Sequence, residues 1–164
     1  MALTDPRIAI VGSGAVGCFY GAKLLHSGLD VHFLMRSDLV HVGKAGLRIE
    51  SAVTGDLELP HISAHGDTED IGPCDLVIIA LKATDNEALK VLIPPLLQEH
   101  TALLTLQNGL GNEDFLAEFF GPGRVMGGLC FVCLNRISPG VIRHVAEGGV
   151  SVGDYDLVKA SLKK

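Results

Sequence analysis

Six consecutive residues near the start of the chain have the spacing of a loop that binds phosphate groups. They fit the pattern Gly-x-Gly-x-x-Gly and are Gly12, Ser13, Gly14, Ala15, Val16 and Gly17. Gly12 would permit a tight turn, Gly14 a close backbone approach to a pyrophosphate, and Gly17 close packing of the following helix. N–H groups at the start of that helix would attract the phosphates. The pattern predicts a dinucleotide-binding loop; the alternative is a tight turn that binds no ligand.

A basic residue occupies the position that distinguishes NAD-binding from NADP-binding sites. NAD sites carry an acidic residue about 20 positions after the glycine loop, where it binds ribose hydroxyls. Here Arg36 comes 19 positions after Gly17 (36 − 17), followed by Ser37. A guanidinium can hold a 2′-phosphate with two hydrogen bonds and stack on adenine, and Asp38 fits the start of a helix better than the ribose acid. The residues favour NADP(H); the alternative is a surface arginine that begins a helix.

Two more polar residues follow apolar runs that read as buried strands. Lys82 comes after residues 76–81, and Asn108 comes after residues 103–107. Because open parallel sheets bind ligands at the carboxyl ends of their strands, we expect both residues on the same rim as the glycine loop. Lys82 could contact cofactor phosphate, ribose or an anionic substrate, and the Asn-Gly turn could present an amide to the nicotinamide ribose. Taken singly, each could equally be an ordinary loop residue.

The elements that must position these residues alternate between strand and helix, which predicts an α/β fold of the Rossmann type. We expect a doubly wound, mainly parallel sheet with a hairpin insertion. Strands are predicted at Arg7–Val11, Val31–Met35, Leu47–Ser51, Leu57–Leu59, Asp75–Leu81, Ala102–Leu106, Arg124–Cys133, Val141–Ala146 and Val150–Gly153. Helices are predicted at Ala15–His26, at Leu39–Ala45, from Thr84 or Asp85 to Pro94-Pro95 or slightly beyond, and from Gly111 to Phe120.

The length of 164 residues fits one domain with a full core. We expect residues 1–153 to form an NADP-binding domain and residues 154–164 to begin an amphipathic helix. Oxidoreductases of this type use a second domain to close over the nicotinamide, and a chain of this length has no room for one. We therefore expect an N-terminal domain whose C-terminal helical partner is absent.

Composition and charge exclude several other classes of protein. The net charge is −6 and the basic residues are scattered, which argues against nucleic-acid binding. No apolar run reaches the roughly 18 residues of a membrane span, and the N-terminus has no signal-peptide anatomy. The hydrophobic content of 48% fits either strands covered on both faces or a surface that docks on something outside the chain.

Cysteines and histidines give no sign of a disulfide framework or a metal site. We expect the four cysteines, Cys18, Cys74, Cys130 and Cys133, to be buried thiols in a reducing cytoplasm. Cys130 and Cys133 spell Cys-x-x-Cys, but they fall in a strand-like stretch, where positions i and i+3 face opposite sides. The seven histidines show no pairing at metal-ligand spacing.

Taken together, these motifs resemble the ketopantoate reductase (2-dehydropantoate 2-reductase) family over nearly the whole chain. The matching elements, in the family's order, are the glycine loop followed by Cys18-Phe19-Tyr20-Gly21, then Arg36, Leu81-Lys82-Ala83, Leu106-Gln107-Asn108-Gly109-Leu110-Gly111, the run from Ser138 to His144, and Gly148.

The resemblance implies NADPH-dependent reduction of 2-dehydropantoate to pantoate, a step of pantothenate and coenzyme A biosynthesis. It implies that residues 12–17 bind the pyrophosphate, that Arg36 binds the 2′-phosphate, and that Lys82 and Asn108 lie beside the nicotinamide. Asn108 could also touch the substrate, and residues 131–134 would line the cofactor. The family's general-acid lysine belongs to the helical C-terminal domain, so we expect no catalytic residue in this chain, weak NADP(H) binding and little or no reductase activity alone.

Two other functions stay open from the sequence. The domain could sense NADP(H) without chemistry, or it could belong to a reductase of another 2-oxo acid. Oligomeric state is also open, a homodimer included.

Overall fold

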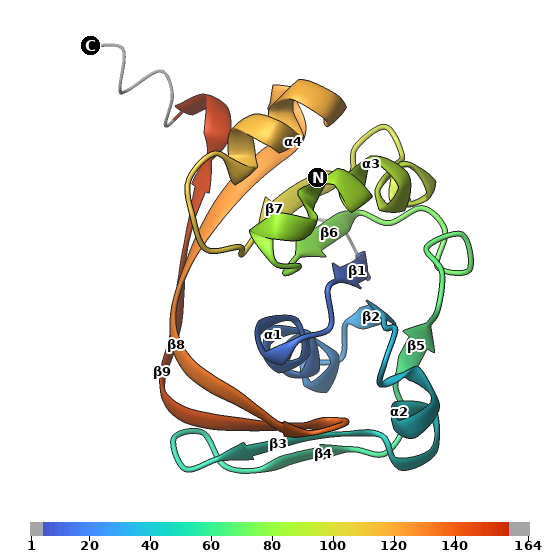
Figure 1. The fold of residues 1–164 in the computed structure, drawn as a ribbon, viewed down its shortest axis with the longest axis vertical. Helices are drawn as coiled ribbons and strands as arrows, with labels where there is room; N and C mark the ends of the chain where they lie inside the picture. Colours follow the sequence, from blue (N-terminus) through green and yellow to red (C-terminus); the bar gives the residue numbers. More distant parts are fainter. Residues whose placement is uncertain (1–4, 158–164) are drawn as a thin grey trace.

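The computed structural model describes residues 5–157, in which strands and helices alternate along most of the chain (Figure 1). The strands are β1 (Arg7–Val11), β2 (Asp30–Leu34), β3 (Leu47–Ser51), β4 (Leu57–Leu59), β5 (Ser63–His65), β6 (Leu76–Ile79), β7 (Ala102–Thr105), β8 (Val125–Ser138) and β9 (Val141–Asp154). The α-helices are α1 (Ala15–His26), α2 (Leu39–Ala45), α3 (Leu89–Leu92) and α4 (Asn112–Phe120), and the 3₁₀ helices are η1 (Ala83–Ala88), η2 (Pro94–Leu96) and η3 (Pro122–Arg124).

All nine described strands form one sheet in the order β4-β3-β9-β8-β7-β6-β1-β2-β5. Neighbours are parallel except in the β3–β4 and β8–β9 pairs, which are antiparallel. The predicted mainly parallel α/β sheet is therefore confirmed, and the predicted hairpin insertion is β3–β4, which joins the sheet edge through β9. Strands β1 and β6 are apolar runs buried almost throughout, as expected for parallel strands covered on both faces.

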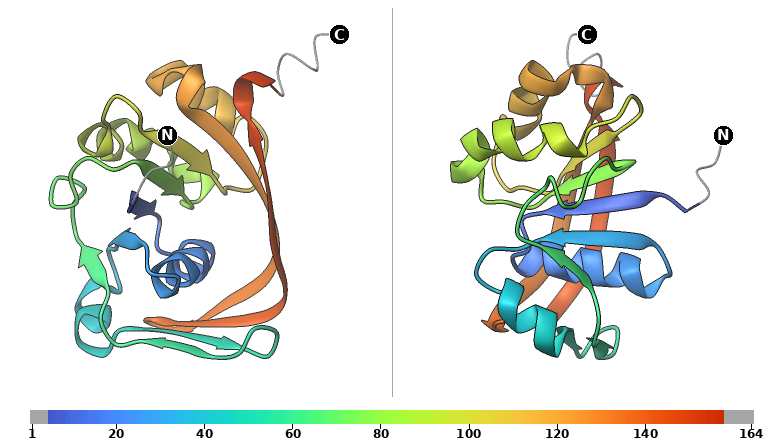
Figure 2. Two further views of the ribbon diagram at one scale, coloured as in Figure 1. Left: turned by 180° about the vertical axis from the view of Figure 1, so that it is seen from behind. Right: turned by 90° about the vertical axis from the view of Figure 1, so that its right-hand side faces the viewer.

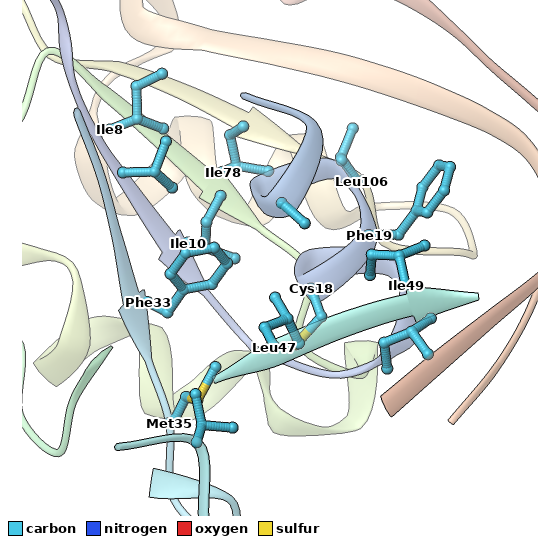
Figure 3. Packing of buried hydrophobic residues seen from close by; sticks show 14 residues of the cluster. Ile8, Ile10, Cys18, Phe19, Phe33, Met35, Leu47, Ile49, Ile78 and Leu106 are labelled. Carbon is cyan, nitrogen blue, oxygen red and sulfur yellow. The ribbon is translucent and has the colours of Figure 1, made fainter. Parts of the chain in front are cut away.

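Helix α1 is the centre of the larger of two hydrophobic clusters. The sheet bends around it, with β1 and β2 on one side and β8, β9 and β3 on the others (Figures 1 and 2). In Figure 3, Ile10 of β1 and Phe33 of β2 lie together, Cys18 of α1 lies near Leu47 of β3, and Phe19 of α1 lies on the side of Ile49 of β3. Gly21 of α1 lies against Phe33, where an added Cβ would come within 2.4 Å of the ring. This close packing fixes the start of α1 relative to the ends of β1 and β2.

The second cluster covers the opposite face of β1, β6 and β7. Leu89 and Ile93 from the α3 region and Leu116 from α4 are fully buried against Val77 and Ile79 of β6. Helices on both faces of the sheet confirm the doubly wound architecture.

The short elements and the strand ends differ from the prediction. The helix expected from Thr84 or Asp85 to Pro94-Pro95 or slightly beyond is split into η1, α3 and η2. The α-helical part ends at Leu92 because Pro94 and Pro95 have no N–H to continue it. The predicted strands at 31–35, 75–81 and 102–106 are shifted or shortened, and β5, a short polar segment, was missed. The start of the predicted C-terminal helix is helical at residues 155–157, and its remainder lies outside the described residues.

The three strands predicted after residue 124 are in fact two long strands joined at Ser138-Pro139-Gly140. Pairing runs from Met126↔Asp154 to Ser138↔Val141. The sequence predicts a break near Glu147 and Gly148, but in the structure both residues belong to a bulge within β9, with φ of 64° and 128°.

The expectation that all four cysteines are buried is wrong for two of them. Cys18 and Cys74 are buried, but Cys130 is half-buried and Cys133 is exposed. The cause is the alternation of β8: Cys130 faces α1, whereas Cys133 lies on the outer face with Leu129 and Phe131, which are 73% and 71% exposed. Part of the high hydrophobic content is therefore surface and not core.

These environments predict the order in which the thiols react. Burial raises the pKa of the Cys18 thiol to about 12 and that of the Cys74 thiol to about 11, so both stay protonated at pH 8. We expect iodoacetamide to modify Cys133 first and to leave Cys18 and Cys74 unmodified until the protein unfolds, as read by peptide mass spectrometry. All four should react in concentrated urea. Rapid labelling of Cys18 in the folded protein would contradict this arrangement.

Candidate cofactor-binding site

A pocket of about 700 Å³ lies at the carboxyl ends of three neighbouring parallel strands, β6, β1 and β2. It is lined by the loop after β1 (residues 12–14), the segment after β2 (residues 34–38), Gly66, the segment after β6 (residues 80–82), parts of η1 and α3, and Arg136 of β8. Open α/β sheets bind ligands at this edge, at the point where the chain turns to opposite sides of the first strand.

The glycine loop has a backbone that tolerates no side chain at two of its positions. Gly12 has φ of +105°, and an added Cβ would lie 2.4 Å from the backbone nitrogen of Leu81. At Gly17 an added Cβ would lie 2.1 Å from the carbonyl oxygen of Gly12. The loop is thus pressed between the segment after β6 and the first turn of α1, as the glycine spacing predicted.

Gly14 differs from the other two glycines, because no atom of the described residues lies within 4 Å of the position its Cβ would take. Gly14 is the N-cap of α1 and makes no side-chain hydrogen bond to the helix. The first N–H groups of α1 have no acceptor within the helix, so they are available to a ligand at this end of the pocket. The hydroxyl of Ser13 donates to the carbonyl oxygen of Leu34 at 2.8 Å and so ties the loop to the end of β2. This shape fits a phosphate group at the start of α1.

The segment after β2 contributes three polar residues to the pocket wall. Arg36 and Ser37 are exposed, whereas Asp38 is buried at the start of α2. The Asp38 carboxylate accepts hydrogen bonds from Arg136 of β8, from the N–H of Gly140 at 3.2 Å and from the Ser37 hydroxyl at 3.0 Å. Burial alone would raise the pKa of this carboxyl, but these bonds hold it below its usual value.

Lys82 lines the pocket at the end of β6, as predicted. Asn108 follows β7, one strand further along the same edge; it is exposed and does not line this pocket. Ala15, Val16 and Gly17, in the first turn of α1, are not among the lining residues either. The predicted residues thus follow strands that end at one edge of the sheet, and only some of them line the pocket.

Side-chain amides join the loops that carry Lys82 and Asn108. Gln107 donates to Asn86 of η1 at 2.8 Å, and Asn86 donates to Asn112 of α4 at 3.0 Å. Asn112 is 2% exposed and its amide also donates to the carbonyl of Asn108 at 3.3 Å. The network holds the Asn108 loop against η1, so the two loops form one rim.

Arg136 lines the pocket and was not predicted from the sequence; the same holds for Gly66 and for the lining residues of η1 and α3. Arg136 lies 98 residues from Asp38 and enters through the tip of the β8–β9 hairpin. No local pattern distinguishes it from Arg143, the other arginine of the hairpin. The resemblance had instead suggested that residues 131–134 line the cofactor, but Arg136 is the β8 residue in this pocket.

Residues 5–157 contain neither a metal-binding cluster nor a membrane-spanning helix. No group of three or more histidine, cysteine or acidic side chains there could hold a metal ion. No helix of this region is long and apolar enough to span a lipid bilayer.

A mainly parallel sheet with helices on both faces, and a glycine loop that opens a pocket at its carboxyl edge, defines a domain of the Rossmann type. The model of the family "Ketopantoate reductase PanE/ApbA" matches residues 8–156. The chain belongs to this family, as the sequence motifs suggested.

Named relatives and solved structures agree with this assignment. The 2-dehydropantoate 2-reductase of Nostoc sp. is 42% identical over 153 residues, which are 93% of this chain and 48% of the relative. The crystal structure of 2-dehydropantoate 2-reductase from Geobacter metallireducens has a TM-score of 0.89 at 48% identity, over 91% of this chain and 49% of the other. This chain thus spans about half the length of these relatives.

A more distant likeness concerns an enzyme solved with a nicotinamide cofactor. D-mandelate dehydrogenase, in a ternary structure with NADH and anilino(oxo)acetate, has a TM-score of 0.81 at 25% identity, over 96% of this chain and 51% of the other. This enzyme, which has the same fold, was thus solved with NADH bound.

Proposed function

We propose that this chain binds NADP(H) and forms the cofactor-binding part of a reductase that converts 2-dehydropantoate to pantoate. The observation that carries the choice of NADP(H) is Arg36: it lines the pocket directly after β2, where NAD sites have an acid. The relatives named 2-dehydropantoate 2-reductase support the reaction.

Each part of the pocket edge has a separate task in this proposal. The first turn of α1, with open space at Gly14, holds the pyrophosphate. Arg36 holds the 2′-phosphate with two charge-assisted hydrogen bonds, and Ser37 adds a hydroxyl. Lys82 and Asn108, on the β6 and β7 side, lie toward the nicotinamide and the substrate carbonyl.

When bound, NADPH supplies the hydride. Reduction of the ketone also needs a proton donor for the developing alkoxide. Lys82 is the one lysine among the described residues that line the pocket, and we do not assign it this role. We propose that the general acid is a residue outside residues 5–157, and that the 164-residue chain binds the cofactor without reducing 2-dehydropantoate at an enzymatic rate.

Equilibrium titration with NADPH and NADH, before and after Arg36→Ala, tests the cofactor assignment. Loss of a bidentate charged contact costs about 1.5–3 kcal/mol, so NADPH affinity should fall about 10- to 100-fold. NADH lacks the 2′-phosphate, so its affinity should change little. NADPH oxidation in the presence of 2-dehydropantoate, followed in the same samples, should stay at the uncatalysed rate.

Arg48→Ala is the matched control, because Arg48 is a half-exposed arginine of β3 that does not line the pocket. It removes the same charge and should leave both affinities unchanged. Equal affinities for NADPH and NADH in the unsubstituted protein would rule out the NADP assignment. Rapid turnover by the 164-residue chain would show that it carries its own general acid.

A further inference from the structure

Asp38 places a carboxylate in the pocket wall two residues after Arg36. In NAD sites an acidic residue in this region accepts hydrogen bonds from the ribose hydroxyls and repels a 2′-phosphate. We call the wall formed by Arg36, Ser37, Asp38 and Arg136 the Arg36 end of the pocket. An uncompensated carboxylate at this end would repel the phosphate dianion that is proposed to bind there.

The Asp38 carboxylate is fully engaged by its neighbours. Both oxygens accept from the guanidinium of Arg136, one of them from Nε at 3.1 Å, and the backbone N–H of Gly140 and the Ser37 hydroxyl donate to them as well. The Asp38 side chain is 9% exposed. Little of its negative charge is left to face the pocket, because a buried carboxylate with this many donors is neutralised locally.

Arg136 reaches this position from the far end of the hairpin. It lies two residues before the turn at Ser138-Pro139-Gly140, and Gly140 in that turn contacts the same carboxylate. The Arg136 side chain is 42% exposed and lines the pocket together with Arg36. The tip of the β8–β9 hairpin thus forms part of the wall at the Arg36 end of the pocket and places the positive charge of Arg136 there.

We propose that Arg136 is a specificity-determining residue that sets NADPH over NADH by holding the Asp38 carboxylate away from the 2′-phosphate. It acts through Asp38 and is a positioning residue. Without it, the freed carboxylate would repel the phosphate bound by Arg36 and offer an acceptor to the ribose hydroxyls of NADH. The inference rests on the proposed function, because it assumes that the Arg36 end holds the adenosine ribose.

The test measures equilibrium dissociation constants for NADPH and NADH in four proteins: unsubstituted, Arg136→Gln, Asp38→Asn and the double variant. Arg136→Gln should weaken NADPH binding about tenfold or more and leave NADH unchanged or tighter, since only NADPH carries the repelled phosphate. The double variant, in which Asp38→Asn is added to Arg136→Gln, should regain the preference for NADPH, because the negative charge of Asp38 is gone.

The matched control is Arg143→Gln, on the same hairpin and outside the pocket. It breaks the exposed ion pair of Arg143 with Glu50 of β3, in which Nε and Nη2 lie 3.1 and 2.8 Å from one carboxylate oxygen. It changes the net charge equally and should not alter the ratio of the two affinities. Thermal melts monitored by circular dichroism establish that each variant is folded at the titration temperature.

Three results would overturn the inference. Equal weakening of NADPH and NADH in Arg136→Gln would make Arg136 a structural residue only. Failure of Asp38→Asn to restore the preference would mean that Arg136 binds the phosphate directly. If Arg136→Gln does not fold, the double variant must match Asp38→Asn in its affinity ratio, and a lower ratio overturns the inference. Insensitivity of NADPH binding to Arg36→Ala would instead refute the proposed function itself.

Discussion

Replacing Gly12 by alanine should destabilise the domain by about 2–5 kcal/mol, a large part of the roughly 5–15 kcal/mol of a typical domain. Two costs add. Alanine at φ of +105° pays about 1–2 kcal/mol for a left-handed conformation. Its Cβ would also lie 2.4 Å from the Leu81 nitrogen, and relieving that overlap by moving backbone costs about 1–3 kcal/mol.

The measurement is the thermal midpoint by circular dichroism, which should fall on the order of 10 °C. Gly28→Ala is the matched control: Gly28 also has a positive φ, +94°, but no atom of the described residues lies within 4 Å of its Cβ position. It should therefore show the conformational cost without the overlap. Equal losses in the two variants would mean that the loop is not pressed against the segment after β6.

Replacing Gly14 by alanine should leave the stability of the domain nearly unchanged and weaken NADPH binding. Gly14 has φ of −81°, which any residue adopts, and its Cβ would enter open space, so stability should change by no more than about 1 kcal/mol. That space is where we propose the pyrophosphate binds. Loss of charge-assisted bonds worth about 1.5–3 kcal/mol should weaken NADPH binding about 10- to 100-fold.

The two cofactors distinguish this effect from that of Arg36. The pyrophosphate is common to NADPH and NADH, so Gly14→Ala should weaken both, whereas Arg36→Ala should weaken NADPH alone. Gly43→Ala in α2 is the control, since no described atom lies within 4 Å of its Cβ position either and it is outside the pocket. Unchanged NADPH affinity in Gly14→Ala would show that the pyrophosphate does not bind at the start of α1.

The parts of the fold that sequence predicted best are those fixed by neighbouring residues. Helix α1 was predicted with its observed bounds, because an apolar strand, a glycine turn and the stop at Gly28 all lie within one short segment. The prediction was poorer where long-range pairing decides. Nothing local indicates that β8 extends past Cys133 to Ser138; pairing with β9 stabilises those residues as strand.

The sequence by itself determined the class of site. Gly12, Gly14 and Gly17 dictate the turn and the helix start through sterics within a few residues, and Arg36 follows β2 directly, so chain connectivity alone places it at the loop's edge of the sheet. Only the tertiary structure decided what surrounds Arg36. Arg136 meets Asp38 across 98 residues because β9 pairs with both β8 and β3, which carries the hairpin tip to the start of α2. This contact depends on strand pairing between distant parts of the chain, which no local pattern around Asp38 or Arg136 indicates.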